Sequence, residues 1–112
     1  MIPERGDFIW LNFDPQVGHE EAKRRPALVL SPAEYHSLTG LIVVCPVTSV
    51  SKGYPFEVAV PPDAPVSGFV LADHVKSLDF AARRGERIGP APASLVDEVL
   101  AKVAALLDLK VY

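Results

Sequence analysis

Three polar side chains beside predicted strands have the chemistry to act on a phosphodiester. Arg25 stands at the entrance of one apolar run, Thr48 comes at the end of a second, and Glu20 lies in the turn before the arginine. A guanidinium presents a planar fork of donors suited to phosphate, and it stays charged at any working pH. The set therefore favours a phosphodiester over a carbonyl as the target.

Each of these residues also has a purely structural interpretation. An arginine at a strand edge is usually a solvated charge, hydroxyls after a proline commonly satisfy backbone groups in a turn, and loop carboxylates are most often solvated. The functional hypothesis therefore depends on the ordered set and not on any one member. Trp10 and Phe13 are predicted to be core residues, with stacking on an RNA base as the alternative.

Metal and thiol chemistry have little support in the sequence. His19, His36 and His74 are far apart, and none has a second ligand at metal-site spacing, so we predict no metal and no cofactor. A Ser/His/Asp arrangement stays open, although no nucleophile-elbow pattern is present. Cys45 is the single cysteine and lies in an apolar strand, which predicts a buried hydrophobe rather than a nucleophile. A lone cysteine fits a reducing, cytoplasmic location.

Composition and charge indicate one soluble globular domain spanning residues 1–112. Of the 112 residues, 49% are hydrophobic and 22% are charged. No apolar run reaches membrane-spanning length, and no export signal is present. A net charge of -3 argues against a general nucleic-acid coat. Two local basic blocks, 23–25 and 83–87, nevertheless allow a short nucleic-acid segment to bind, unless each is simply a solvated surface.

The pattern of apolar residues predicts a mainly β fold (α+β), a small barrel of short antiparallel strands with one C-terminal helix. Strands are expected at 8–13, 27–30, 41–47, 56–60 and 68–71, with no helices between them. Ser94 followed by Asp97 resembles a capping box. The apolar residues that then repeat at helical spacing are Val96, Val99, Leu100, Val103, Leu106 and Leu107. We expect this face to lie against the barrel or a partner.

Seven segments, in order, resemble the MazF/PemK family of toxin endoribonucleases. They are Arg5-Gly6-Asp7 leading to Trp10-Leu11-Asn12-Phe13-Asp14-Pro15, Gly18-His19-Glu20-Glu21-Ala22, Arg25-Pro26-Ala27-Leu28-Val29-Leu30-Ser31-Pro32, Cys45-Pro46-Val47-Thr48-Ser49, Lys52-Gly53-Tyr54-Pro55-Phe56-Glu57-Val58, and Leu71-Ala72-Asp73-His74-Val75-Lys76-Ser77. No single segment is decisive, but the ordered series covers most of the chain.

The resemblance implies an SH3-like barrel, assembled as a homodimer, that cuts single-stranded RNA without metal. The family's catalytic arginine falls on Arg25, its threonine on Thr48, and a glutamate used by some members on Glu20. It also implies a cognate MazE-like antitoxin that binds through a flexible tail. RNA contacts are predicted at His19, Lys23, Arg24, Ser49, Lys52, Lys76, Arg83 and Arg84.

The chain departs from the usual family pattern at positions expected to touch RNA. His19 stands where many members have serine, Glu21 where they have glutamine, Lys23 where glycine is common, and His74 where glutamine is common. The cleaved sequence and the class of RNA are therefore not predicted. His19 is also a second candidate for proton transfer, since an imidazole titrates near neutral pH.

Without a metal, the nearest nucleophile for an RNA phosphodiester is the neighbouring 2'-hydroxyl, and the products are a 2',3'-cyclic phosphate and a 5'-hydroxyl. Arg25 then stabilises the phosphorane, Thr48 holds a phosphate oxygen or orients Arg25, and Glu20 or His19 accepts the proton. Cleavage of messenger RNA would stop translation and growth. Two alternatives are a non-catalytic toxin of the same fold that binds a topoisomerase, and a single-stranded RNA-binding module without cleavage.

Overall fold

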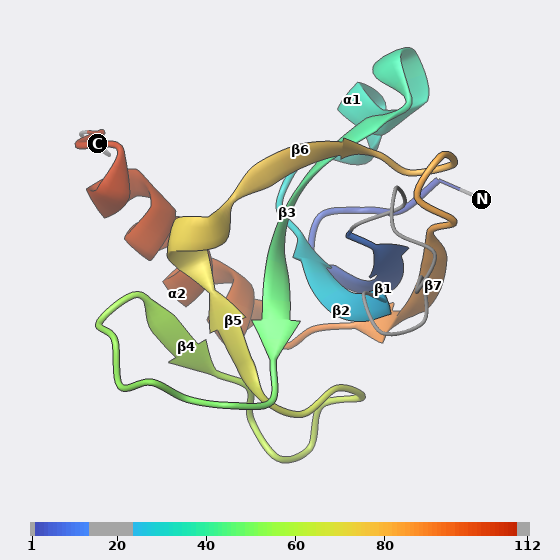
Figure 1. The fold of residues 1–112 in the computed structure, drawn as a ribbon. Coiled ribbons are helices and arrows are strands. Elements are labelled where there is room, and N and C mark those ends of the chain that lie inside the picture. The colour runs from blue at the N-terminus through green and yellow to red at the C-terminus, as the bar shows by residue number, and fades with distance from the viewer. Residues whose placement is uncertain (1, 14–23, 110–112) are drawn as a thin grey trace.

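The structure, a computed structural model, describes residues 2–13 and 24–109 and is built mainly from short strands (Figure 1). The elements in chain order are β1 (Asp7–Asn12), β2 (Arg24–Val29), α1 (Ala33–Thr39), β3 (Leu41–Thr48), β4 (Glu57–Ala59), β5 (Phe69–Leu71), the 3-10 helix η2 (Ala72–His74), β6 (Lys76–Asp79), β7 (Glu86–Pro90) and α2 (Ala93–Leu106).

The strands form one antiparallel sheet in the order β4-β5-β3-β2-β1-β7, and β6 also pairs with β3. β3 organises this sheet because it has three partners. Its first half pairs with β6, its middle with β2, and its last two residues, Val47 and Thr48, with β5. The end of β3 is therefore the point at which the two parts of the sheet meet.

The strands β7, β1, β2, β3 and β6 curve around a common centre (Figure 1). Within the described residues, β6 and β7 form no ladder with each other, so the sheet curls without closing. The predicted mainly β class with short antiparallel strands and a C-terminal helix is confirmed, and the barrel takes the form of a strongly curved sheet that is not closed.

Alternation along the strands divides the apolar side chains between two clusters. One contains Phe8, Leu28, Cys45 and Val47 together with the buried residues of α2. The other face carries a cluster made by Ile9, Leu11, Ala27, Val29, Ile42 and Val44. Every member of this second cluster is fully buried. The curled sheet is thus covered on both faces near its middle.

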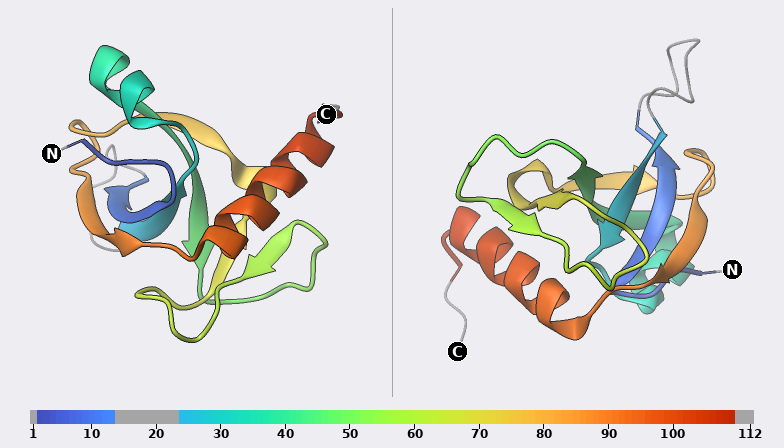
Figure 2. Two further views of the ribbon diagram at one scale, coloured as in Figure 1. Left: turned by 180° about the vertical axis from the view of Figure 1, so that it is seen from behind. Right: turned by 90° about the horizontal axis from the view of Figure 1, so that it is seen from below.

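Helix α2 lies along one side of the sheet (Figure 2) and covers the first cluster. Leu95, Val96 and Val99 are buried, so the predicted apolar face is confirmed for the first part of the helix. Leu106 and Leu107 are exposed and do not pack against the sheet, so contact of this end of the face with a partner stays a prediction. Within the described residues, neither α-helix is long and apolar enough to span a membrane.

The predicted capping box at Ser94 and Asp97 is wrong. The helix begins two residues earlier than that motif requires, with Pro92 as the N-cap and no side-chain capping bond. The Pro92 carbonyl accepts hydrogen bonds from the amides of Leu95 and Val96 at 3.0 and 3.2 Å. Proline is well suited to the start of a helix, and here it sets the boundary that the serine was expected to set.

The prediction that no helix separates the strands is also wrong, because α1 lies between β2 and β3. Pro32 precedes this helix, and Gly40 ends it in the left-handed conformation with its amide bonded to the His36 carbonyl. The helix has no apolar stripe, since Leu38 is 86% exposed. Its inward contact is instead polar. His36 is buried and bonds to the Ser31 hydroxyl and the Pro3 carbonyl, at 2.5 and 2.7 Å.

Candidate active site

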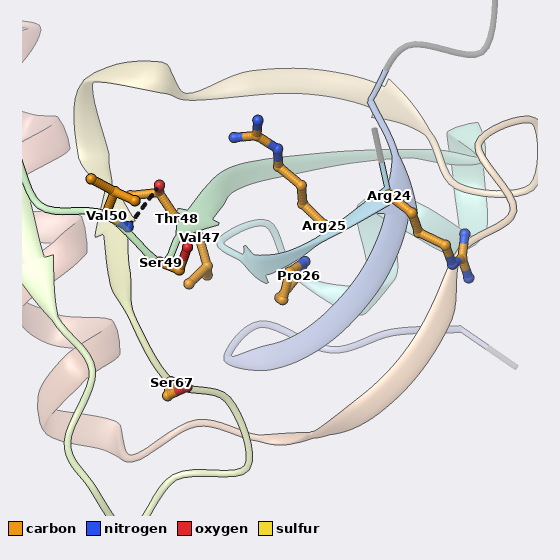
Figure 3. Close-up of a pocket in the computed structure, with 8 residues that line it drawn as sticks. All are labelled: Arg24, Arg25, Pro26, Val47, Thr48, Ser49, Val50 and Ser67. Atoms are coloured by element: carbon orange, nitrogen blue, oxygen red, sulfur yellow. Dashed lines mark hydrogen bonds between the residues drawn. The ribbon is translucent and has the colours of Figure 1, made fainter. Parts of the chain in front are cut away.

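An open pocket of about 440 Å³ lies where β2 begins and β3 ends. Its walls come from three segments: the start of β2, the end of β3 with the loop after it, and the residue before Gly68. The lining residues are Arg24, Arg25, Pro26, Val47, Thr48, Ser49, Val50 and Ser67 (Figure 3). Antiparallel pairing of β2 with β3, which aligns Ala27 with Pro46, brings these two strand ends to the same edge.

Arg25 and Arg24 are adjacent in the strand and point in opposite directions (Figure 3). The Arg25 side chain is exposed and extends into the open space beside the end of β3. Among residues 2–13 and 24–109, the structure records no hydrogen bond or ion pair of its guanidinium. With respect to these residues, its donors are therefore available to a ligand that binds in the pocket.

The Arg24 guanidinium points away from the pocket and is held by two side chains. It donates to Asn12 Oδ1 at 3.0 Å and to Glu86 Oε1 at 2.9 Å. Asn12 is buried and aligns with Arg24 in the β1–β2 ladder. Arg24 thus joins β2 to β1 and β7, and its predicted contact with RNA would have to compete with these two bonds.

Thr48, the last residue of β3, presents its hydroxyl at the pocket. Its Oγ1 accepts a hydrogen bond from the Val50 amide at 3.3 Å. A hydroxyl has one proton to donate and two lone pairs to accept, so this contact leaves the proton free. The Thr48 hydroxyl therefore keeps its proton available to donate to an oxygen atom that binds in the pocket.

Arg25 and Thr48 lie on the same face of the sheet as the second apolar cluster. Arg25 is two positions before Ala27, and Thr48 is four positions after Val44, and both of those residues belong to that cluster. Alternation then carries the two polar side chains onto the continuation of this face, at its open end. The predicted pair is brought to one pocket, as the sequence suggested.

Lys76 extends the positive character of this face. It aligns with Val44 in the β3–β6 ladder, and residues paired in this way project to the same side. Its ammonium lies 5.6 Å from the centre of the Phe13 ring. Phe13 packs at the edge of the second cluster, so its predicted place in the core is confirmed in part. Trp10, in contrast, is 39% exposed.

The loop after Thr48 is held by one carboxylate. Glu57 accepts from the Ser51 hydroxyl at 2.7 Å and from the Lys52 amide at 2.9 Å. Both bonds lower the pKa of Glu57, and the bond from the Lys52 amide has the larger effect. Ser49 and Lys52, both predicted to contact RNA, are exposed in this loop, and Ser49 lines the pocket while Lys52 does not.

Two arginines of the second basic block already bind oxygen atoms of the protein. Arg83 donates to the carbonyls of Asn12 and Phe13, and Arg87 pairs with buried Asp7 at 3.1 Å. The hydrogen bond that Arg87 donates to Asp7, together with the negative charge of Asp7, raises the pKa of Arg87. Arg84 is exposed in a left-handed turn. The block is therefore not the free cationic patch that its charges suggest, and Arg84 is its most available member.

Glu20, His19 and Lys23 lie outside the described residues, so the structure does not place them. Cys45 is fully buried, and burial raises the pKa of its thiol to about 12, which confirms the prediction of an inert hydrophobe. In the described part of the chain, no three His, Cys, Asp or Glu side chains gather as a metal site would require.

The sequence interpretation missed Ser67 and Val50 as pocket residues. Ser67 comes from the segment before β5, and Val50 from the loop after β3. Gly68 after Ser67 is a turn signal in the sequence, but no local pattern predicts that this turn lies beside Thr48.

Comparison with known proteins identifies relatives over nearly the whole chain. A family model described as a PemK-like, MazF-like toxin of type II toxin-antitoxin systems matches residues 4–107. Endoribonuclease toxin MazF of Escherichia coli K12 is 42% identical over 106 residues, 95% of each chain. Endoribonuclease PemK of Escherichia coli is 33% identical over 108 residues, 93% of this chain and 81% of PemK.

Solved structures agree with these relationships. MazF of Deinococcus radiodurans (Form-I) is 55% identical, with a TM-score of 0.89 over 97% of this chain and 99% of that one. A MazE-MazF structure from the same organism (Form-II) has a chain that is 50% identical, with a TM-score of 0.87 over 98% of this chain and 99% of that one. This chain belongs to the PemK-like, MazF-like family of type II toxin-antitoxin toxins.

Proposed function

We propose that this chain is an endoribonuclease toxin that cuts single-stranded RNA at the pocket between β2 and β3. The observation that carries the proposal is the meeting of Arg25 and Thr48 in one open pocket. Family membership supports it, because relatives at 42% and 33% identity are named endoribonucleases. The remaining steps derive what these side chains contribute.

The nucleophile in this mechanism belongs to the substrate. The 2'-oxygen of one nucleotide attacks the adjacent phosphorus, a new P–O bond forms, and the bond to the 5'-oxygen of the next nucleotide breaks. The 2'-proton passes to a base, and the leaving 5'-oxygen receives a proton. The products are a 2',3'-cyclic phosphate and a 5'-hydroxyl. The protein has to position the phosphate, stabilise its added charge and move protons.

Arg25 stabilises the charge that develops on the phosphate oxygens. Its donors have no partner within the described residues, so binding a phosphate breaks no bond to that part of the chain. The planar fork can contact two oxygens at once. A guanidinium does not act as a proton acceptor at ordinary pH, because its pKa exceeds about 12. Arg25 is therefore assigned to transition-state stabilisation and not to general base catalysis.

Thr48 donates a hydrogen bond to a non-bridging phosphate oxygen. The Val50 amide already occupies one acceptor position of its hydroxyl. The hydroxyl proton is left available at the pocket, where charge on the phosphate increases during the reaction. A prepositioned donor of this kind contributes without reorganisation at the moment of reaction.

Glu20 remains the proposed proton acceptor, with His19 as the alternative. Both lie a few residues before Arg25 in the sequence. A carboxylate or a neutral imidazole can each take the 2'-proton. Replacing each residue separately and measuring the pH dependence of cleavage distinguishes them.

The proposed RNA path follows the positive and hydroxyl-bearing residues near the pocket. Ser49 lines it, Lys76 lies on the same sheet face as Arg25, and Lys52 is exposed in the adjoining loop. Lys23 and Arg84 are further candidates for backbone contact. Arg24 and Arg83 are weaker ones, because their guanidinium groups already bind protein oxygens.

A protein that destroys RNA in its own cytoplasm needs an inhibitor. The MazE-MazF structures of Deinococcus radiodurans support a MazE-like antitoxin as the cognate partner. We propose that its flexible tail enters the pocket and that the toxin, a single-domain chain, acts as a homodimer. A flexible segment that orders on binding needs a large contact surface to offset its lost entropy.

The test is cleavage by the purified chain of a labelled single-stranded RNA in excess EDTA, with the same RNA in a duplex as the control. Cleavage of the single strand, lost in Thr48→Val, supports the proposal. Binding without cleavage would support an RNA-binding module. If the protein neither binds nor cleaves RNA but still arrests the growth of cells, the result favours the topoisomerase-binding class.

A further inference from the structure

Gly68 makes an unusually close backbone contact with Thr48. A Cβ atom added at Gly68 would lie 2.2 Å from the Thr48 carbonyl oxygen and 3.1 Å from its carbonyl carbon. These atoms belong to the main chain, so a rotamer change cannot move them aside. Gly68 also has φ +128°, a conformation that side-chain-bearing residues rarely adopt. Only glycine permits this approach.

Both sides of this contact are tied to neighbouring strands. The Gly68 carbonyl accepts a hydrogen bond from the Val60 amide at 2.9 Å, and the next residue, Phe69, aligns with Thr48 in the β3–β5 ladder. Thr48 is the last residue of β3, and exposed Ser49 and Val50 follow it. Added bulk at Gly68 would therefore push the two main chains apart and displace Thr48 from its present position.

A displacement of Thr48 would change the orientation of its hydroxyl. The Thr48 Oγ1 accepts from the Val50 amide at 3.3 Å, already near the long end of ordinary hydrogen bonds. Moving the Thr48 main chain by a fraction of an ångström would weaken this bond. The Thr48 hydroxyl would then no longer hold its position at the pocket.

We infer that Gly68 is a positioning residue, which sets the Thr48 hydroxyl by letting the start of β5 approach the Thr48 carbonyl. The inference rests on the proposed cleavage function and adds a residue that touches no substrate. Gly40 and Gly53 also have positive φ but lack such a close contact. Both have φ +74°, but a Cβ at either position would meet nothing within 4 Å.

The experiment compares Gly68→Ala with Gly40→Ala. The second variant places alanine at positive φ, at the end of α1, without a contact to the site, so it controls for a glycine-to-alanine change at positive φ away from the pocket. We expect Gly68→Ala to lower kcat at least tenfold more than Gly40→Ala, with KM changed less than threefold. Equal kcat values, with both proteins folded by circular dichroism, would overturn the inference.

A second measurement follows the Val50 amide and does not depend on activity. In Gly68→Ala its exchange with solvent should accelerate, whereas Gly40→Ala should leave it unchanged. Unchanged exchange in both variants would contradict the inference even if kcat falls. Because this readout needs no substrate, absence of cleavage by the wild-type protein would refute the proposed function without deciding the role of Gly68.

If Gly68→Ala does not fold, Val60→Pro tests the same contact from its other side. This change removes the amide that holds the Gly68 carbonyl. We expect faster exchange of the Val50 amide and a severalfold lower kcat. Wild-type values of both in folded Val60→Pro would refute the inference.

Discussion

The two adjacent arginines should have different roles, with Arg25 supporting catalysis and Arg24 supporting stability. Arg25 extends into the pocket without a partner among the described residues, whereas Arg24 points away and bonds to Asn12 and Glu86. The perturbation is the replacement of each by alanine in turn. The two variants remove the same charge from neighbouring positions, so each is the control for the other.

The magnitudes follow from these contacts. Removing one donor aimed at developing charge costs on the order of 10²–10³ in rate, which is about 2.7–4 kcal/mol, and we expect this for Arg25→Ala. Its stability should change by no more than about 0.5 kcal/mol, as at other exposed sites. Arg24→Ala leaves the buried Asn12 oxygen without its donor, which costs about 1–3 kcal/mol. The exposed pair with Glu86 adds about 0–1 kcal/mol.

The assay combines initial rates of cleavage of a labelled single-stranded RNA with unfolding in urea. Arg25→Ala should lose the rate and keep its urea midpoint, and Arg24→Ala should keep its rate within severalfold and lose stability. If Arg24→Ala loses as much activity as Arg25→Ala while still folded, the assignment of Arg24 to structure is wrong. Near-wild-type cleavage by Arg25→Ala would refute the active-site assignment.

Three further predictions concern the hydroxyl, the loop and the partner. Thr48→Ser should keep at least about a tenth of the rate, whereas Thr48→Val, which removes a single aimed donor, should lose on the order of 10²-fold, and equal rates would contradict a role for the hydroxyl. Because hydrogen bonds lower the pKa of Glu57, the carboxylate stabilises its loop fully above the unfolded-state value of 4.5, and that contribution disappears as pH falls through the lower folded pKa. The Lys52 amide should therefore be protected relative to its intrinsic exchange rate at neutral pH and lose that protection only as pH falls below 4.5, whereas in Glu57→Gln the protection should already be lost at neutral pH. A tail peptide of the antitoxin should displace an uncleavable deoxy-substituted RNA, and a ternary complex with both affinities unchanged would exclude a shared pocket.

The strands that could be predicted from sequence are those with apolar content. The strand predicted at 27–30 and the one at 41–47 correspond to β2 and β3, because their buried side chains leave a clear pattern. β6 and β7 escaped prediction, since their sequences are mostly polar and their stability comes from ladders to β3 and β1. α1 escaped it because its inward contact is His36 rather than an apolar stripe.

The candidate site was predictable only in part. Arg25 and Thr48 were identified from residue type and family resemblance, and the antiparallel register then explains why they meet. Local sequence could not show that Arg24 points away, because that depends on Asn12 from β1 and Glu86 from β7. Nor could it show that Gly68 contacts Thr48, because the two are neighbours only through the β3–β5 pairing.

The most direct test of the central claim is cleavage of an RNA that carries a single 2'-deoxy nucleotide just 5' of the scissile bond. If the 2'-oxygen is the nucleophile and Arg25 and Thr48 only stabilise and position the phosphate, this substitution should abolish cleavage at that bond while binding persists. The unmodified RNA should yield a 2',3'-cyclic phosphate and a 5'-hydroxyl in excess EDTA. Cleavage of the deoxy-substituted RNA at the same bond would require another nucleophile, and the mechanism built on this pocket would be wrong.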